Sequence, residues 1–223
     1  MPLCVPLVNP SHFAIVPHQK QQLGLKKGFI ITNANCSTTG IVVPLHALEK
    51  AFGPLETVMV TTMQAISGAG YPGVPSLDIL DNVVPYIGKE EEKIEWELAK
   101  ILGGLSDDMT EFDYHSKHPM KVSAHCNRVP VVDGHLECMS IRFARRPPPS
   151  PQQVKDALKA FYCEAQKMGC PSAPQQAIVV HEAPDRPQVR PPFSLSGLPS
   201  PSRLLIRSHT DAPSLSSLLA APP

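Results

Sequence analysis

The chain has 223 residues, a hydrophobic fraction of 42%, and 20 lysines and arginines against 20 aspartates and glutamates. This length is enough for a domain with a sizeable core, and the balanced charge gives no electrostatic basis for binding nucleic acid or an anionic membrane. No apolar run approaches a membrane span, and residues 1–10 lack the basic start and apolar core of a secretory signal. The 6 cysteines are scattered without clustered metal ligands, so we expect reduced thiols in a cytoplasmic protein that holds no metal.

The first part of the chain leads to a cysteine at a helix start. We expect a short helix or loop over residues 11–22, a strand and tight turn from residue 30, and a helix over residues 38–52. Backbone N–H groups at a helix start are unpaired and partly positive, so a thiol there ionises more easily. Cys36 is therefore a candidate nucleophile, with the Asn35 amide beside it as a donor to a developing oxygen anion. The alternative is that Cys36 is an ordinary buried thiol.

A strand rich in valine, threonine and methionine is expected over residues 56–66. The following residues, 68–73, fit the G-x-G-x-x-G pattern of a dinucleotide-binding turn. A second proline follows soon after them. The pattern after these glycines predicts neither the helix nor the second strand that a dinucleotide-binding motif requires. We interpret these glycines as a loop that permits close approach of another group, rather than as a phosphate-binding fingerprint.

The clearest amphipathic helix is expected over residues 89–102, with a charged start and an apolar stripe. Glu97 and Lys100 are three residues apart and share a face of this helix. Taken alone, this spacing is typical of an ordinary surface ion pair.

Two strand-like runs, residues 121–132 and 136–144, flank an Asp-Gly turn signal and predict a hairpin. Arg128 and His135 would lie on opposite faces under regular strand alternation, but the turn between them removes that constraint. The sequence therefore permits these two side chains to meet without requiring it. A lone histidine at such a position is more often structural than catalytic.

The chain ends in a helix, a strand and a tail of unusual composition. Ser150 and Gln153 predict a capped helix start, and residues 177–181 are expected to form a last strand. From residue 190 onwards, 34 residues include 7 prolines and 8 serines. Such a segment buries too little apolar surface to offset chain entropy, so we expect residues 191–223 to be disordered.

Several separated motifs stand in the order seen in aspartate-semialdehyde dehydrogenases, and the chain resembles the fungal and archaeal branch of that family. The motifs are Asn35-Cys36-Ser37-Thr38, the loop 64–73, Glu97 with Lys100, and Arg128 with His135. The resemblance implies an α+β fold, a mixed or antiparallel sheet with helices on one face and a second subunit on the other. It divides the chain into a junction remnant (1–35), a catalytic and dimerisation domain (36–190) and the tail (191–223).

The resemblance also implies a reaction: L-aspartate 4-semialdehyde, phosphate and NADP give 4-aspartyl phosphate and NADPH, in the pathway to threonine, methionine, isoleucine and lysine. Cys36 would be the nucleophile and His135 the general base and then acid. The other implied positions are Gln64 to orient the acyl group, Arg128 for the substrate carboxylate, Glu97 for its ammonium, Lys100 for phosphate or carboxyl oxygens, Asn35 beside the substrate, and Ser67 and Gly68 at the nicotinamide. A homodimer or homotetramer is implied.

The family begins with a dinucleotide-binding domain, and the resemblance starts only where that domain ends. We therefore expect this chain to be inactive by itself. The proline- and serine-rich tail also departs from the family pattern, and a misread exon boundary or a frameshift in the gene model would explain it. Two alternatives remain: a non-catalytic dimerisation module, and an enzyme like N-acetyl-gamma-glutamyl-phosphate reductase. The pairing of Glu97 with Lys100 suits a free amino group and argues against the second.

Overall fold

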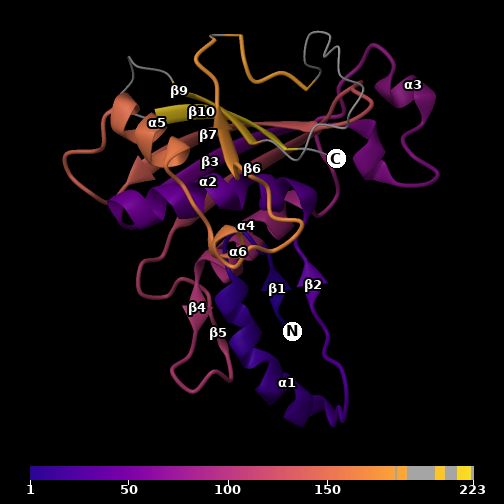
Figure 1. The fold of residues 1–223 in the computed structure, drawn as a ribbon. Coiled ribbons are helices and arrows are strands. Elements are labelled where there is room, and N and C mark those ends of the chain that lie inside the picture. Colours follow the sequence, from indigo (N-terminus) through magenta and orange to yellow (C-terminus); the bar gives the residue numbers. More distant parts are fainter. Residues whose placement is uncertain (184, 190–203, 209–214, 222–223) are drawn as a thin grey trace.

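The computed structural model describes residues 1–183, 185–189, 204–208 and 215–221. At its centre lies a mixed six-stranded sheet with the long helix α2 packed along one face (Figure 1). The strand order is β6-β3-β7-β10-β9-β8. The bounds are β3 (Leu55–Gln64), β6 (Lys121–Arg128), β7 (His135–Phe143), β8 (Ile178–Val180), β9 (Leu204–Ser208) and β10 (Leu215–Ala221). The predicted α+β class with a mixed sheet is confirmed.

Helix α2 (Cys36–Phe52) and β3 form much of the core. Apolar residues of α2 recur every three or four positions and so share its buried face; they include Ile41, Leu45 and Leu48. On β3, Val58 and Val60 are buried while Met59 between them is 54% exposed, as the two-residue period of a strand requires. One face of the sheet therefore carries the core, and Met59 lies on the other.

The predicted hairpin between residues 121–132 and 136–144 is wrong. β6 and β7 are not neighbours, because β3 lies between them, parallel to β6 and antiparallel to β7. The connecting residues 129–134 cross the end of β3, where Val131 O accepts from Ile66 N at 2.8 Å. Alternating apolar patterns identify strands but not their partners, and an earlier strand of matching length bonds to both.

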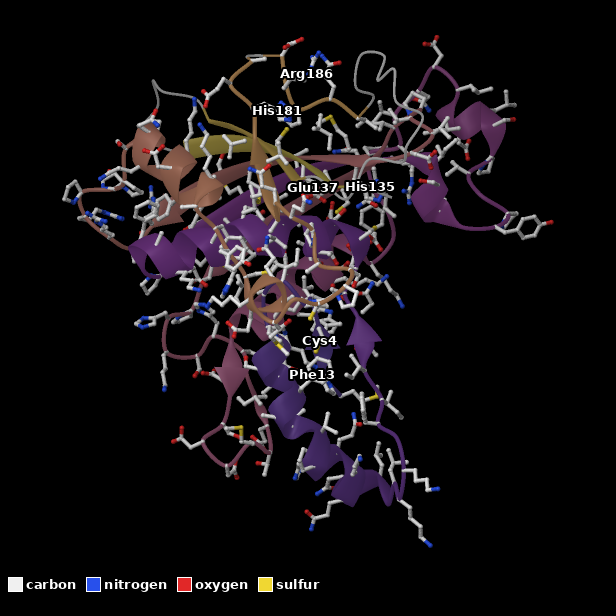
Figure 2. The ribbon with its side chains drawn as sticks, viewed as in Figure 1. Cys4, Phe13, His135, Glu137, His181 and Arg186 are labelled. Carbon is white, nitrogen blue, oxygen red and sulfur yellow. The ribbon has the colours of Figure 1, made fainter. Side chains whose placement is uncertain are left out.

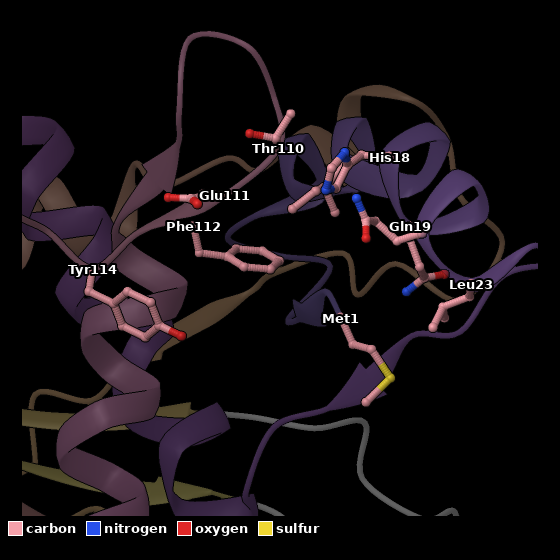
Figure 3. A pocket seen from close by; sticks show the side chains of 10 residues that line it. Met1, His18, Gln19, Leu23, Thr110, Glu111, Phe112 and Tyr114 are labelled. Atoms are coloured by element: carbon pink, nitrogen blue, oxygen red, sulfur yellow. The ribbon is translucent and has the colours of Figure 1, made fainter.

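The N-terminal residues form an arm that extends away from the sheet (Figure 1). It contains β1 (Leu3–Cys4), a 3-10 helix η1 (Pro10–Ile15), α1 (Val16–Leu23) and β2 (Thr32–Asn33). β2 is shorter than the strand predicted before Cys36, because its parallel partner β1 offers only two residues. The small pair β4 (Gly104–Leu105) and β5 (Phe112–Asp113) is antiparallel. A pocket of about 450 Å³ between α1 and the β5 region is lined by residues such as His18, Gln19 and Phe112 (Figure 3).

The remaining helices are η2 (Ile66–Ala69), α3 (Ser76–Ile79), α4 (Glu90–Leu102), α5 (Pro151–Lys159) and α6 (Glu164–Lys167). Among them, α4 and α5 lie where the sequence pattern predicts them, and the short helices η2, α3 and α6 were not predicted. The capped start of α5 is confirmed, since Ser150 Oγ accepts from Gln153 N at 3.3 Å and Gln153 Oε1 accepts from Ser150 N at 2.8 Å. Within the described ranges, no helix has the length and apolar character needed to cross a membrane.

Part of the predicted disordered tail is ordered as strands. β10 pairs antiparallel with β7 along seven positions, and β9 lies between β10 and β8. The structure has these two segments as strands, and the expectation of disorder for residues 191–223 as a whole stays a prediction. The rest of the range 191–223 lies outside the described residues.

Candidate active site

Cys36 is the first residue of α2, and a network of hydrogen bonds fixes the turn before it. Asn35 is the N-cap: its Oδ1 accepts from Ser37 N at 3.0 Å and from Thr38 N at 3.2 Å. Asn35 N in turn donates to Glu97 Oε2 at 2.9 Å. The thiol is thereby held at a helix start, as predicted, and it is open to solvent.

His135 meets Cys36 at the start of β7. Its Nε2 lies 3.2 Å from Cys36 Sγ, and its Nδ1 accepts from Ala65 N at 3.0 Å. Because a backbone N–H only donates, Nδ1 carries no proton, and a neutral ring then holds its proton on Nε2. His135 therefore presents an N–H to the sulfur atom.

Arg128 reaches the same place from the end of β6. Its Nη1 donates to Ala65 O at 2.7 Å. Arg128 therefore binds the carbonyl oxygen of Ala65, and His135 binds the backbone N–H of the same residue. Arg128 lies on β6 and His135 on β7, and these strands flank β3. Because the two residues are on different strands, the alternation of side chains along one strand does not place them on opposite faces. Both are nearly buried, with 6% of Arg128 and 2% of His135 exposed.

Gln64 is the last residue of β3, directly before Ala65, and Gly68 lies against the Arg128 and His135 side chains. Gln64, 1% exposed at the end of β3, donates from Nε2 to Thr62 Oγ1 at 3.2 Å. At Gly68 in η2, a Cβ would lie 3.1 Å from Arg128 Nη1 and 3.2 Å from His135 Cε1. The glycine is needed for close approach, and η2 with the turn after it confirms that residues 68–73 form a loop.

The structure adds Glu90, which sequence reasoning missed. Glu90 Oε2 accepts from Asn35 Nδ2 at 2.6 Å, and Glu90 Oε1 pairs with Lys93 Nζ at 3.1 Å. The Asn35 amide predicted to serve an oxygen anion is thus bonded to a carboxylate here. A signal was present, because α4 carries Glu-x-x-Lys twice, seven residues or about two turns apart.

Glu97 and Lys100, the second such pair, have other contacts. Glu97 is 6% exposed and accepts from the Asn35 backbone. Lys100 Nζ donates to Met1 O at 3.2 Å and lies 4.2 Å from the centre of the Phe112 ring. The structure therefore brings Glu97 behind Asn35, and places Lys100 against the N-terminal arm.

Comparison with known proteins identifies the family. A family model described as the dimerisation domain of semialdehyde dehydrogenase matches residues 45–194. The chain belongs to the semialdehyde dehydrogenase family. It is 68% identical over 189 residues to the aspartate-semialdehyde dehydrogenase of Cryptococcus neoformans, covering 85% of this chain and 52% of that protein. The resemblance inferred from the motifs is confirmed.

Solved semialdehyde dehydrogenase structures match the whole fold. The crystal structure of aspartate semialdehyde dehydrogenase with NADP from Candida albicans superposes with a TM-score of 0.81 at 44% identity, covering 99% of this chain and 61% of that one. Aspartate semialdehyde dehydrogenase II from Vibrio cholerae gives a TM-score of 0.66 at 25% identity and covers 62% of that chain. The chain spans about half the length of the curated relatives it matches.

In this semialdehyde dehydrogenase chain, burial dominates the protonation of the pair. Desolvation by the surrounding protein raises the pKa of the Cys36 thiol, and the carboxylates of Glu90 and Glu137 raise it further, while the backbone N–H groups of Ser37 and of Cys36 itself lower it. The N–H groups at the helix start act in the predicted direction, but desolvation outweighs them, so the prediction that this thiol ionises more easily is wrong. Burial and the Arg128 charge lower the pKa of His135, which keeps its ring neutral.

Proposed function

We propose that this chain is the catalytic and dimerisation part of an aspartate-semialdehyde dehydrogenase, which turns L-aspartate 4-semialdehyde, phosphate and NADP into 4-aspartyl phosphate and NADPH. The observation that supports it best is the 3.2 Å contact between Cys36 Sγ and His135 Nε2 at a helix start. A thiol and an imidazole in contact are the parts of a covalent acyl-transfer site.

Charges beside the pair match an amino acid substrate. The planar guanidinium of Arg128 suits a carboxylate, since it can bind both oxygens. Glu90 provides a negative charge next to Asn35, which suits an ammonium group. We assign the ammonium contact to Glu90 and a supporting role behind Asn35 to Glu97. A free ammonium also argues against an N-acetylated substrate.

The proposed chemistry begins when Cys36 passes its proton to Nε2 of His135 and the resulting thiolate attacks the aldehyde carbon. The His135 N–H donates first to the sulfur and then to the oxygen that becomes negative, while Gln64 orients that group. Transfer of the hydride from the aldehyde carbon to a bound NADP would leave an acyl-thioester on Cys36, and attack of phosphate on it would give the acyl phosphate and release the Cys36 thiolate. For His135 to act as a general base, its Nε2 must lose the proton, and this requires the Ala65 contact at Nδ1 to open.

The residues present fit the reacting end of a nicotinamide cofactor. Gly68 leaves the space over His135 and Arg128 that a Cβ would fill, and Ser67 adjoins it in η2. A bound NADP would supply the acceptor for the hydride. The described residues include no glycine-rich strand, turn and helix for its phosphates, so we expect this chain alone to turn over substrate negligibly.

The test is a chimera in which the cofactor-binding half of the Cryptococcus relative precedes this chain. We expect it to form NADPH from aspartate semialdehyde and phosphate, and to reject N-acetyl-glutamate semialdehyde. A folded chimera that prefers the N-acetylated substrate would support the reductase alternative. A folded chimera without activity on either would support a non-catalytic dimerisation module.

We further propose that the protein acts as a homodimer or homotetramer in the cytoplasm. Met59, half-exposed on the face of the sheet opposite α2, offers apolar surface for a second copy. Replacing it in Met59→Glu should shift the assembly toward monomer in light scattering. An unchanged mass would contradict this use of the face.

A further inference from the structure

A buried carboxyl group lies behind the nucleophile and has no assigned role. Glu137 on β7 is 0% exposed, and neither carboxyl oxygen has a hydrogen-bond partner among the described residues. The hydroxyls of Ser37 and Thr38, also 0% exposed, likewise have no hydrogen-bond partner among the residues that the structure describes. Buried polar groups without partners are rare in proteins and call for an explanation.

Glu137 shares its side of the sheet with the catalytic pair. It follows His135 by two residues on one strand, so both side chains point to the same face, and Figure 2 labels the two beside each other. In the ladder with β3 it stands opposite Thr62, which is also buried. Ser37 and Thr38 belong to the first turn of α2, directly after Cys36.

A charged carboxylate is unfavourable in this place. No cation of the described residues pairs with it, and burial raises the pKa of Glu137 well above its usual value. The nearby Ser37 hydroxyl acts in the opposite direction, although the two groups do not have the geometry of a hydrogen bond. Its negative charge would act on three thiols around it: Cys36 of α2, Cys126 of β6 and Cys138 of β7. Each of these thiols would be harder to ionise beside a carboxylate.

We propose that Glu137 is a positioning residue for Cys36: a buried carboxylic acid that is neutral near neutral pH, competes with the thiol for ionisation only in the alkaline range, and has its O–H available to the hydroxyls of the first turn of α2. Glu137 and Cys36 share one negative charge between them, so ionisation of either group disfavours ionisation of the other. The importance of this for catalysis rests on the proposed function, but the protonation states can be measured without dehydrogenase activity.

The first measurement is infrared spectroscopy of the full chain near neutral pH. Glu137→Gln has the same shape and cannot ionise, so the difference spectrum should show one protonated carboxylic acid band in the parent that the variant lacks. The matched control Glu49→Gln, about 20 Å along α2 from Cys36, should leave that band in place. No band lost in Glu137→Gln would overturn the proposal.

The second measurement is the alkylation rate of Cys36 by iodoacetamide from about pH 6 to about pH 10, read on the Cys36 peptide by mass spectrometry. Glu137→Gln should react several-fold faster than the parent in the alkaline range, since no second negative charge opposes the thiolate. Identical profiles in the two proteins would overturn the proposal.

A second substitution keeps the proposal testable if Glu137→Gln does not fold. If Glu137→Gln fails to fold, Glu137→Met carries the same measurements, because an apolar side chain of similar length is tolerated where a neutral acid was buried. If Glu137→Met loses no protonated carboxylic acid band, Glu137 is charged in the parent and the proposal is overturned. If the unsubstituted chimera is inactive on aspartate semialdehyde, the proposed function fails. The infrared and alkylation results do not depend on that activity and still decide the proposal about Glu137.

Discussion

Asn35 Nδ2 donates to Glu90 Oε2 at 2.6 Å, and this contact joins the first turn of α4 to the first turn of α2 beside Cys36. The same asparagine accepts from two backbone N–H groups of α2 and donates its own N–H to Glu97. One residue thus connects the nucleophile's helix to two carboxylates of α4, and its substitution should affect both stability and reactivity.

Removing the cap with Asn35→Ala should lower the free energy of unfolding by about 0.5–2 kcal/mol, the usual range for a lost N-cap. Urea denaturation checks this. Ser150→Ala, which removes the cap of α5 away from Cys36, is the matched control and should cost a similar amount. Only Asn35→Ala should also change the alkylation rate of Cys36, and equal alkylation in both variants would contradict the assigned role.

Glu90→Gln should speed alkylation of Cys36. The Glu90 carboxylate raises the pKa of the thiol, so its removal increases the thiolate fraction at a given pH. We expect an increase of about two- to tenfold near neutral pH. Glu92→Gln, an exposed neighbour on α4, should leave the rate unchanged. A slower reaction in Glu90→Gln would contradict the electrostatic account.

Gly68→Ala should disturb the catalytic pair at modest cost in stability. The added Cβ would meet Arg128 Nη1 at 3.1 Å and His135 Cε1 at 3.2 Å, so these side chains must move. We expect the chimera to lose at least about tenfold in kcat, with no more than about 1–2 kcal/mol of unfolding free energy. Gly104→Ala is the control, since its Cβ meets nothing within 4 Å. Full activity in Gly68→Ala would refute the close approach.

The ion pair of His115 with Glu49, 3.1 Å apart, should make stability depend on pH. The Glu49 carboxylate raises the pKa of His115 above 6.5. Folded His115 therefore keeps its proton at pH values where the unfolded chain has lost it, and the contribution is full below about pH 6.5 and is lost as pH rises through the folded pKa. His115→Gln should lower the unfolding free energy more at acidic than at alkaline pH, and Glu49→Gln should abolish that difference. Equal losses at both pH values would contradict the pair.

Local features of the site could be read from the sequence, and partner choices could not. The turn before Cys36, the helix α4 and the cap at Ser150 depend on neighbouring residues, and the structure has them where the pattern predicts. The prediction of a hairpin was wrong because β3, which separates β6 from β7 in the sheet, lies far earlier in the chain. Distance along the sequence carries no record of which strands pair.

The choice between carboxylates shows the same limit. Glu90 and Glu97 have identical spacing to a lysine and lie on the same side of α4, so no local pattern separates them. Only the position of Asn35 against the helix shows that Glu90 bonds to its side chain and Glu97 to its backbone. In the same way, the lowered acidity of Cys36 follows from tertiary crowding that a helix-start rule does not include.

The most direct test of the account is the rate of NADPH formation from aspartate semialdehyde by the chimera and by its Cys36→Ser variant. We predict that Cys36→Ser folds with unchanged circular dichroism and loses at least about a thousandfold in kcat, because the hydroxyl cannot replace the thiolate as nucleophile. A variant that keeps activity within about tenfold of the parent would show that Cys36 is not the nucleophile, and the proposed mechanism would be wrong.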